Sequence, residues 1–178
     1  MTNTTEKQRQ GIQSIEVGTR LLRALESPNQ LEERLVDFWF NHFNVFFDKG
    51  LCRMLVADYE ARAIRPHVFG RFRDLLGAVA THPAMLFYLD NAQSTRAGFQ
   101  GAGGSRGLNE NYARELMELF GLGVTDASGK PNYSENDVQQ LAKALSGWQI
   151  DDKNPDDAKS YFTPDRWYNG PKIVFGKF

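Results

Sequence analysis

The stretch that most constrains the fold is residues 108–124, LNENYARELMELFGLGV. Asn109 stands where a helix N-cap is needed, and Glu110 follows in the first turn, where the helix dipole favours negative charge. Gly121 and Gly123 come where a left-handed C-cap ends a helix. At about 100° per residue, the apolar side chains share one arc of this helix, namely Tyr112, Leu116, Leu119 and Phe120. The stretch therefore predicts an amphipathic helix with a defined start and end.

A second helix follows this one closely. Ser134 can cap it, and Asp137 completes an S-x-x-D box. Its apolar stripe consists of Val138, Leu141, Ala142 and Leu145. Apolar stripes at helical spacing recur along the chain, and no pair of alternating segments predicts a sheet. We therefore expect an all-α fold, a multi-helix array of six or seven helices with a long glycine-rich loop.

The N-terminal half predicts further helices and their buried faces. Residues 1–10 are polar, and we expect them to be disordered, followed by a single helical domain over residues 11–178. In the helix expected over residues 11–25, we place Ile12, Ile15, Leu22 and Leu25 inward. In the helix that ends near Asn44, the expected buried face is Leu31, Leu35, Phe38, Trp39 and His42. Residues 91–107 hold five glycines and no apolar stripe, which is typical of a long mobile loop.

Charge and cysteine usage exclude several classes of partner. A net charge of −1 gives no general attraction to nucleic acid, although Arg62, Arg65, Arg71 and Arg73 form a local basic cluster. Cys52 is the single cysteine, so neither an internal disulfide nor a cysteine metal cluster is possible. No apolar run approaches the ~20 residues of a membrane span. We expect no nucleic-acid partner, no membrane span, no metal and no cofactor.

The two central helices also carry a resemblance. NENYARELMELFGLGV and YSENDVQQLAKALSGW resemble the bacterial family catalogued as domain of unknown function 1800 (DUF1800). Further segments agree, namely LEERLVDFWFNHFNVFFDKG, FRDLLGAVATHPAMLFYLDN and FTPDRWYNGPKIVFGKF. The resemblance covers residues 21–178 and implies a helical fold without an established activity.

The resemblance also bears on the ends of the chain and on its partners. Family members are usually longer and often begin with an export signal, and this chain shows no signal peptide. We therefore expect an internal fragment, truncated at both ends relative to the family. Its partner would then be the remainder of its own full-length chain or another protein. The amino-acid sequence does not identify the cellular compartment of the protein.

The polar arc of the central helix is the main candidate site. It consists of Asn111, Arg114, Glu115 and Glu118. One interpretation is an exposed helix surface with weak ion pairs. The other is a buried polar hub in which Arg114 cross-links neighbouring helices. We expect the buried hub, because these residues lie in the most characteristic motif of the resembled family.

Two alternatives would make the chain a hydrolytic or metal-dependent enzyme. His42 lies on an apolar helix face, and Glu115 and Glu118 could serve as its hydrogen-bond partners or complete a metal site. We favour a structural histidine, because the chain has no H-E-x-x-H or E-x-x-H motif. Ser105 lies in a G-x-S-x-G pattern, but no strand precedes it as a nucleophile elbow requires.

A third alternative is a DNA-binding regulator. Residues 11–25 are similar to the first helix of isocitrate-lyase-regulator-type (IclR-type) transcription factors. No recognition helix or basic wing follows this helix. The sequence therefore favours an uncharacterised helical domain with a structural or binding role.

Overall fold

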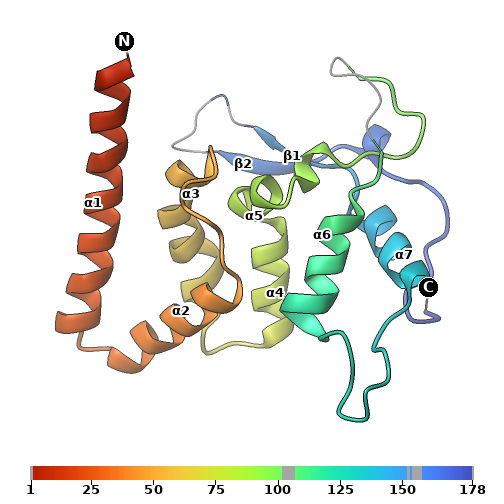
Figure 1. The fold of residues 1–178 in the computed structure, drawn as a ribbon, viewed down its shortest axis with the longest axis horizontal. Helices are drawn as coiled ribbons and strands as arrows, with labels where there is room; N and C mark the ends of the chain where they lie inside the picture. Colours follow the sequence, from red (N-terminus) through yellow and green to blue (C-terminus); the bar gives the residue numbers. More distant parts are fainter. Residues whose placement is uncertain (1, 102–106, 152, 154–157, 178) are drawn as a thin grey trace. The chain divides into compact units, whose positions relative to one another are not determined.

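A computed structural model describes residues 2–101, 107–151, 153 and 158–177 (Figure 1). Its contacts divide the chain into two compact units, Met1–Val79 and Ala80–Phe178. Within the described residues there are seven α-helices and one two-stranded sheet. The expectation of a mostly helical array with six or seven helices is confirmed. The expectation that residues 11–178 form a single domain stays a prediction.

The first unit is built from helices that follow one another closely. They are α1 (Thr2–Glu26), α2 (Gln30–His42), α3 (Cys52–Tyr59) and α4 (Phe72–Thr81), whose last residues belong to the second unit. Between α3 and α4 lie the π-helical segment η1 (Glu60–Ile64) and the 3-10 helix η2 (Arg65–His67). Helix α1 begins at Thr2, within the stretch that we expected to be disordered.

The buried face of α2 differs from the one that we predicted. Leu31 and Phe38 are 66% and 58% exposed, whereas Val36 and Phe40 on the helix and Phe43 at its C-cap are buried. The sequence of α2 carries two apolar stripes, and either could face inward. Contacts with Tyr59 favour the stripe that holds Val36, Phe40 and Phe43. The centroid of the Tyr59 ring lies 6.1 Å from that of Phe40, and the Tyr59 hydroxyl donates to the Phe43 carbonyl at 2.8 Å.

Helix α1 is also turned the other way from our expectation. Ile15, Leu22 and Leu25, which we placed inward, are 71%, 58% and 77% exposed. Ile12, the fourth residue of that stripe, has a side chain outside the described part. The inward face instead carries Arg20 and Arg23, which pair with Glu60. Charge pairing, rather than the burial of the apolar stripe, therefore sets the orientation of this helix.

The second unit combines helices with a hairpin. Its elements are α5 (Pro83–Tyr88), η3 (Asn91–Gln93), α6 (Glu110–Glu115), η4 (Leu116–Gly121), α7 (Glu135–Leu145), β1 (Trp148–Asp151), β2 (Lys159–Phe162) and η6 (Pro164–Arg166). The two strands are antiparallel, with Trp148 opposite Phe162 and Asp151 opposite Lys159. We did not predict this sheet. The alternation of apolar and polar residues over Trp148–Asp151 was the signal for it.

The two central helices confirm the predicted caps at Asn109, Ser134 and Gly123, whereas Gly121 is not among the residues with positive φ. The Asn109 side chain accepts a hydrogen bond from the backbone N–H of Tyr112 at 3.1 Å. Ser134 and Asp137 form the expected reciprocal capping box. Gly123 has φ +75°, as a left-handed C-cap requires. Between α6–η4 and α7 lies a small buried cluster of Ala113, Met117, Val138 and Ala142.

The first residues of the glycine-rich loop are buried and hydrogen-bonded to distant parts of the second unit. Asn91, Ser94 and Thr95 are buried. The Ser94 hydroxyl accepts a hydrogen bond from the backbone N–H of Asn109 at 3.0 Å, and its carbonyl accepts one from Gly147 at 3.4 Å. Tertiary hydrogen bonds thus take the place of the missing apolar stripe at these residues, and the mobility of the loop stays a prediction. Residues 102–106 lie outside the described part.

Candidate functional site

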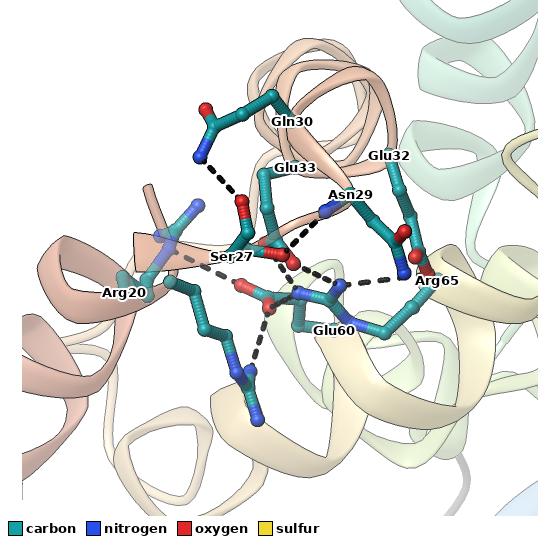
Figure 2. Close-up of polar contacts among 9 residues, drawn as sticks. Arg20, Ser27, Asn29, Gln30, Glu32, Glu33, Glu60 and Arg65 are labelled. Carbon is teal, nitrogen blue, oxygen red and sulfur yellow. Dashed lines mark hydrogen bonds and ion pairs between the residues drawn. The ribbon is translucent and has the colours of Figure 1, made fainter. Parts of the chain in front are cut away.

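The most connected polar cluster of the first unit surrounds Arg65 (Figure 2). The Arg65 guanidinium donates to both carboxylate oxygens of Glu33, at 2.8 and 2.9 Å. The same guanidinium donates to Oε1 of Glu60 at 2.9 Å. Bidentate pairs of this kind fix both distance and orientation. Arg65 thus joins the start of α2 to the start of η1.

Glu60 lies at the centre of this cluster. Its side chain is 3% exposed, and Oε1 also accepts a hydrogen bond from Nη1 of Arg23 at 3.3 Å. Oε2 lies 3.1 Å from Nε of Arg20, which is ion-pair distance. The alignment there is not that of a hydrogen bond, so this buried oxygen has no hydrogen-bond donor among the described residues. Three arginines therefore neutralise the carboxylate while one of its oxygens keeps capacity to accept.

The local backbone explains how Glu60 and Arg65 meet. Glu60 is the first residue of η1, and the backbone N–H of Arg65 donates to the Glu60 carbonyl, five residues back. On an ordinary α-helix these side chains would point about 140° apart. The wider π turn brings them together, and Pro66 then breaks the helical hydrogen bonding. Short π-helical segments are rare and occur often at functional sites.

The charges of the cluster shift the pKa values of its carboxyl groups. The hydrogen bond from Arg65 holds the pKa of Glu33 below its usual range. The bond to Glu33 in turn raises the pKa of Arg65. Burial, reinforced by the charge of Glu60, raises the pKa of Glu16 on the inward face of α1. The Glu33–Arg65 pair is therefore fully charged at neutral pH.

A pocket of about 170 Å³ opens beside Glu60. It is lined by Arg20, Ala24, Gln30, Glu33, Arg34, Val36, Asp37 and Glu60. Its lining combines three carboxylates with two guanidinium groups. The Arg20 guanidinium lies over the Phe40 ring, with 4.1 Å between the guanidinium carbon and the ring centroid. Asp37 is 63% exposed, with its carboxylate 3.8 Å from Arg20, so it retains accepting capacity.

The polar arc of α6 is not the buried hub that we expected. Asn111 is exposed, and Arg114 donates to Oε1 of Glu135 at 2.7 Å with both side chains partly exposed, at 38% and 59%. Glu115 is half-buried, and the half-buried Glu118 accepts a hydrogen bond from the Tyr133 hydroxyl at 3.0 Å. The expected burial is wrong because the opposite arc of α6 packs inward. The contacts still join α6–η4 to the start of α7.

The residues of the enzyme alternatives do not assemble into a described site. His42 is half-buried in the first unit, and the centroid of its ring lies 4.6 Å from that of Phe43. Glu115 and Glu118 belong to the second unit. The described residues contain no group of three or more His, Cys, Asp or Glu side chains that could hold a metal ion. Ser105, the nucleophile candidate, lies outside the described residues.

Sequence reasoning missed the cluster that the structure brings together. We considered Arg65 only as a member of a basic cluster and did not single out Glu33 or Glu60. Glu33 is 32 residues from Arg65, Glu60 is five residues from it on a π turn, and no α-helical spacing rule joins them. A five-residue spacing of Glu and Arg just before a proline was the available local signal.

The comparison with family models decides the membership of this chain. The model described as "Protein of unknown function (DUF1800)" matches residues 2–178. The chain belongs to the DUF1800 family. The match includes residues 11–25, the stretch that suggested a DNA-binding regulator.

The other comparisons add no relative to this DUF1800 chain. A search of curated proteins and a search of solved structures each found no match. Within the part of the chain that the structure describes, no helix is long and apolar enough to cross a membrane. The DUF1800 match supports an uncharacterised helical domain, and no finding favours the hydrolase or the regulator over it.

Proposed function

We propose that this DUF1800 chain is a binding domain and that its first unit holds a small polar ligand in the pocket beside Glu60. The observation that carries the proposal is the state of the Glu60 carboxylate. It is almost fully buried and lines the pocket, and its Oε2 lacks a hydrogen-bond donor among the described residues.

The energetics of buried acceptors support this role. An ionised carboxylate has about four acceptor positions, and a buried acceptor without a donor costs about 1–3 kcal/mol. Arg23 and Arg65 both donate to Oε1, so the deficit lies on the other oxygen. A polar ligand in this pocket would meet carboxylate acceptors and guanidinium donors that already line its wall.

A purely structural role is the second candidate, because the same carboxylate ties α1 to η1 through Arg20 and Arg23. The two roles differ in one respect. A structural cross-link is complete within the chain, whereas a binding site leaves an accessible polar surface. The pocket of about 170 Å³ that Glu60 helps to line favours binding.

Amide NMR on the ¹⁵N-labelled chain tests the proposal with a library of small polar compounds at millimolar concentration. We expect some compounds to shift the amide signals of Ala24, Gln30 and Val36, which line the pocket. The variants Glu60→Gln and Asp37→Asn should weaken these shifts. Glu26→Gln is the matched control, since it removes an exposed carboxylate of α1 outside the pocket.

Two results would contradict the binding role. One is a library in which no compound shifts the pocket amides of the wild-type chain. The other is a set of shifts that remains the same in the control, in Glu60→Gln and in Asp37→Asn. Either result would leave the Glu60 cluster as a structural cross-link.

A further inference from the structure

We infer that a second pocket of the first unit binds an uncharged small molecule that has an apolar body and one hydroxyl group, which donates to the Glu16 carboxylate. The pocket lies between α1 and the segment that follows α2 and has a volume of about 260 Å³. It is distinct from the pocket beside Glu60, although Arg20 lines both. Ligand binding here does not require ligand binding beside Glu60.

One face of α1 forms a wall of this pocket. Its side chains are Gln13, Glu16, Val17 and Arg20. Spacings of three, four and seven residues place all four on the same side of a helix. The rest of the lining comes from the end of α2, the segment after it and α3, namely Phe40, Asn44, Val45, Phe46, Phe47 and Val56. A helix face with two charged side chains thus meets a mostly apolar surface.

The chain covers the apolar part of this lining only in part. Phe40, Val45 and Val56 are buried, whereas Val17 and Phe46 are 51% and 56% exposed. Small-molecule pockets in proteins are lined mostly by apolar side chains, with a few polar groups that orient the ligand. The apolar body of a ligand would remove the exposed surface of Val17 and Phe46 from water, which favours binding.

Glu16 supplies an acceptor that the chain itself does not use. The side chain is half-buried, and no hydrogen bond or ion pair joins its carboxylate to another described residue. Burial is the main reason why the pKa of Glu16 is raised. A hydroxyl group can donate one hydrogen bond to this carboxylate. Hydrogen bonds to an ionised group are stronger than those between neutral groups, so this bond would orient the ligand.

The charges around Glu16 favour an uncharged ligand. The charged groups that act on the pKa of Glu16 are Glu60, Arg20 and Arg23. Together with Glu16 they amount to two carboxylates and two guanidinium groups, so the site has no excess charge that would attract an ion. An ion would also lose much of its hydration among the apolar side chains, which costs free energy. A hydroxyl group supplies the donor at a much smaller cost of dehydration.

The volume of the pocket limits the size of the ligand. A cavity of about 150 Å³ in another protein binds benzene, so a pocket of about 260 Å³ suits roughly eight to twelve non-hydrogen atoms. An aromatic ring that carries a short alcohol group lies within this range, and so does a branched aliphatic alcohol.

Titrations of the full chain at pH 7 and constant ionic strength test this ligand class with benzyl alcohol, anisole, benzylamine and benzoate. Benzyl alcohol and anisole are isomers, but only benzyl alcohol donates a hydrogen bond, while benzylamine is a cation and benzoate an anion. The readout is the amide NMR shifts of Val17, Val45, Phe46 and Val56. We expect benzyl alcohol to bind about tenfold more tightly than anisole, because a hydrogen bond to a charged group is gained. It should also bind more tightly than either ion.

Two variants connect the binding to this pocket. Glu16→Met removes the acceptor, so the two isomers should bind to it with equal affinity. Val17→Trp should prevent binding, because the larger side chain fills the pocket from its exposed rim. Ile15→Trp is the matched control and should bind as the wild-type chain does, since Ile15 is an exposed residue of α1 outside the lining. The variant at Val17 keeps the test decisive if Glu16→Met does not fold.

Several results would overturn this assignment. Equal affinity of the wild-type chain for benzyl alcohol and anisole, or a preference that persists in Glu16→Met, would remove the role of Glu16. Tighter binding of benzylamine or benzoate would contradict an uncharged ligand. An absence of shifts at the four amides, or shifts that Val17→Trp leaves unchanged, would remove the site. Library compounds that shift Ala24, Gln30 and Val36 would still support the proposed function, because these residues line the other pocket.

Discussion

Replacement of Arg65 by alanine tests the central cluster most directly. The substitution removes the bidentate pair with Glu33 and the bond to Oε1 of Glu60. Breaking a buried pair on one side costs about 3–5 kcal/mol. Arg65 is 20% exposed, and Glu60 keeps its contacts with Arg20 and Arg23, so we expect the lower end, about 3 kcal/mol. Arg65→Lys should lose roughly half of that, because lysine keeps the charge without the planar fork.

Urea unfolding followed by circular dichroism measures the free energy of unfolding of both variants. At roughly 2–4 °C per kcal/mol, the melting temperature of Arg65→Ala should fall by about 6–12 °C. The pH dependence gives a second test. The pKa of Glu33 is lowered in the folded chain, so the stability from this pair is present above its unfolded pKa of about 4.3. That stability is lost as the pH falls through the folded pKa.

The difference between wild type and Arg65→Ala should therefore be full at pH 7 and should shrink as the pH falls below about 4. A loss of less than about 0.5 kcal/mol at pH 7 is the range of ordinary surface substitutions. Such a result would refute the central role of Arg65. A difference that persists unchanged at low pH would show that the lost stability comes from packing rather than from the ion pair.

Three further predictions concern Glu16, Arg114 and Gly147. Glu16→Gln should raise the melting temperature at pH 7 but not below about pH 4. Burial and then the charge of Glu60 raise the pKa of Glu16, which makes its ionised form unfavourable in the folded chain. An equal effect at both pH values would contradict this reasoning. Arg114→Ala and Arg114→Lys should both melt like wild type, since the pair with Glu135 is partly exposed; a clear loss in Arg114→Lys would restore the buried hub. Gly147→Ala should lower the melting temperature, because Gly147 has positive φ (+90°) and an added Cβ would lie 3.0–3.1 Å from neighbouring atoms. Gly18→Ala is the control and should not lower it, because nothing lies within 4 Å of a Cβ added there.

The features that the sequence predicted correctly are local ones. The cap at Asn109 and the box between Ser134 and Asp137 each join residues three positions apart. The positive φ at Gly123 likewise depends on the end of one helix. Such features require no knowledge of the tertiary structure, because both partners belong to the same turn of chain.

The orientation of α1 and α2 could not be predicted in the same way. Each helix has more than one face that could be buried. The periodicity of apolar residues compares these faces only by how many apolar side chains each one holds. The structure instead orients α1 by the pairs that Arg20 and Arg23 form with Glu60, which is 37 residues away from Arg23. Tyr59 similarly selects the buried stripe of α2. Single long-range contacts thus decide between faces that the sequence leaves nearly equivalent.

The candidate site could not be predicted from α-helical spacing rules, because its central charge pair lies on a π turn. Those rules look for charge pairs four residues apart, and Asp58 with Arg62 is such a pair at 2.7 Å. Arg62 is 62% exposed, so this predictable pair stabilises little. The pair that matters joins Glu60 and Arg65, whose spacing of five fits only a π turn. A carboxylate five residues before an Arg-Pro step is therefore the pattern by which the same cluster can be sought in other amino-acid sequences, because a π turn brings side chains at this spacing together.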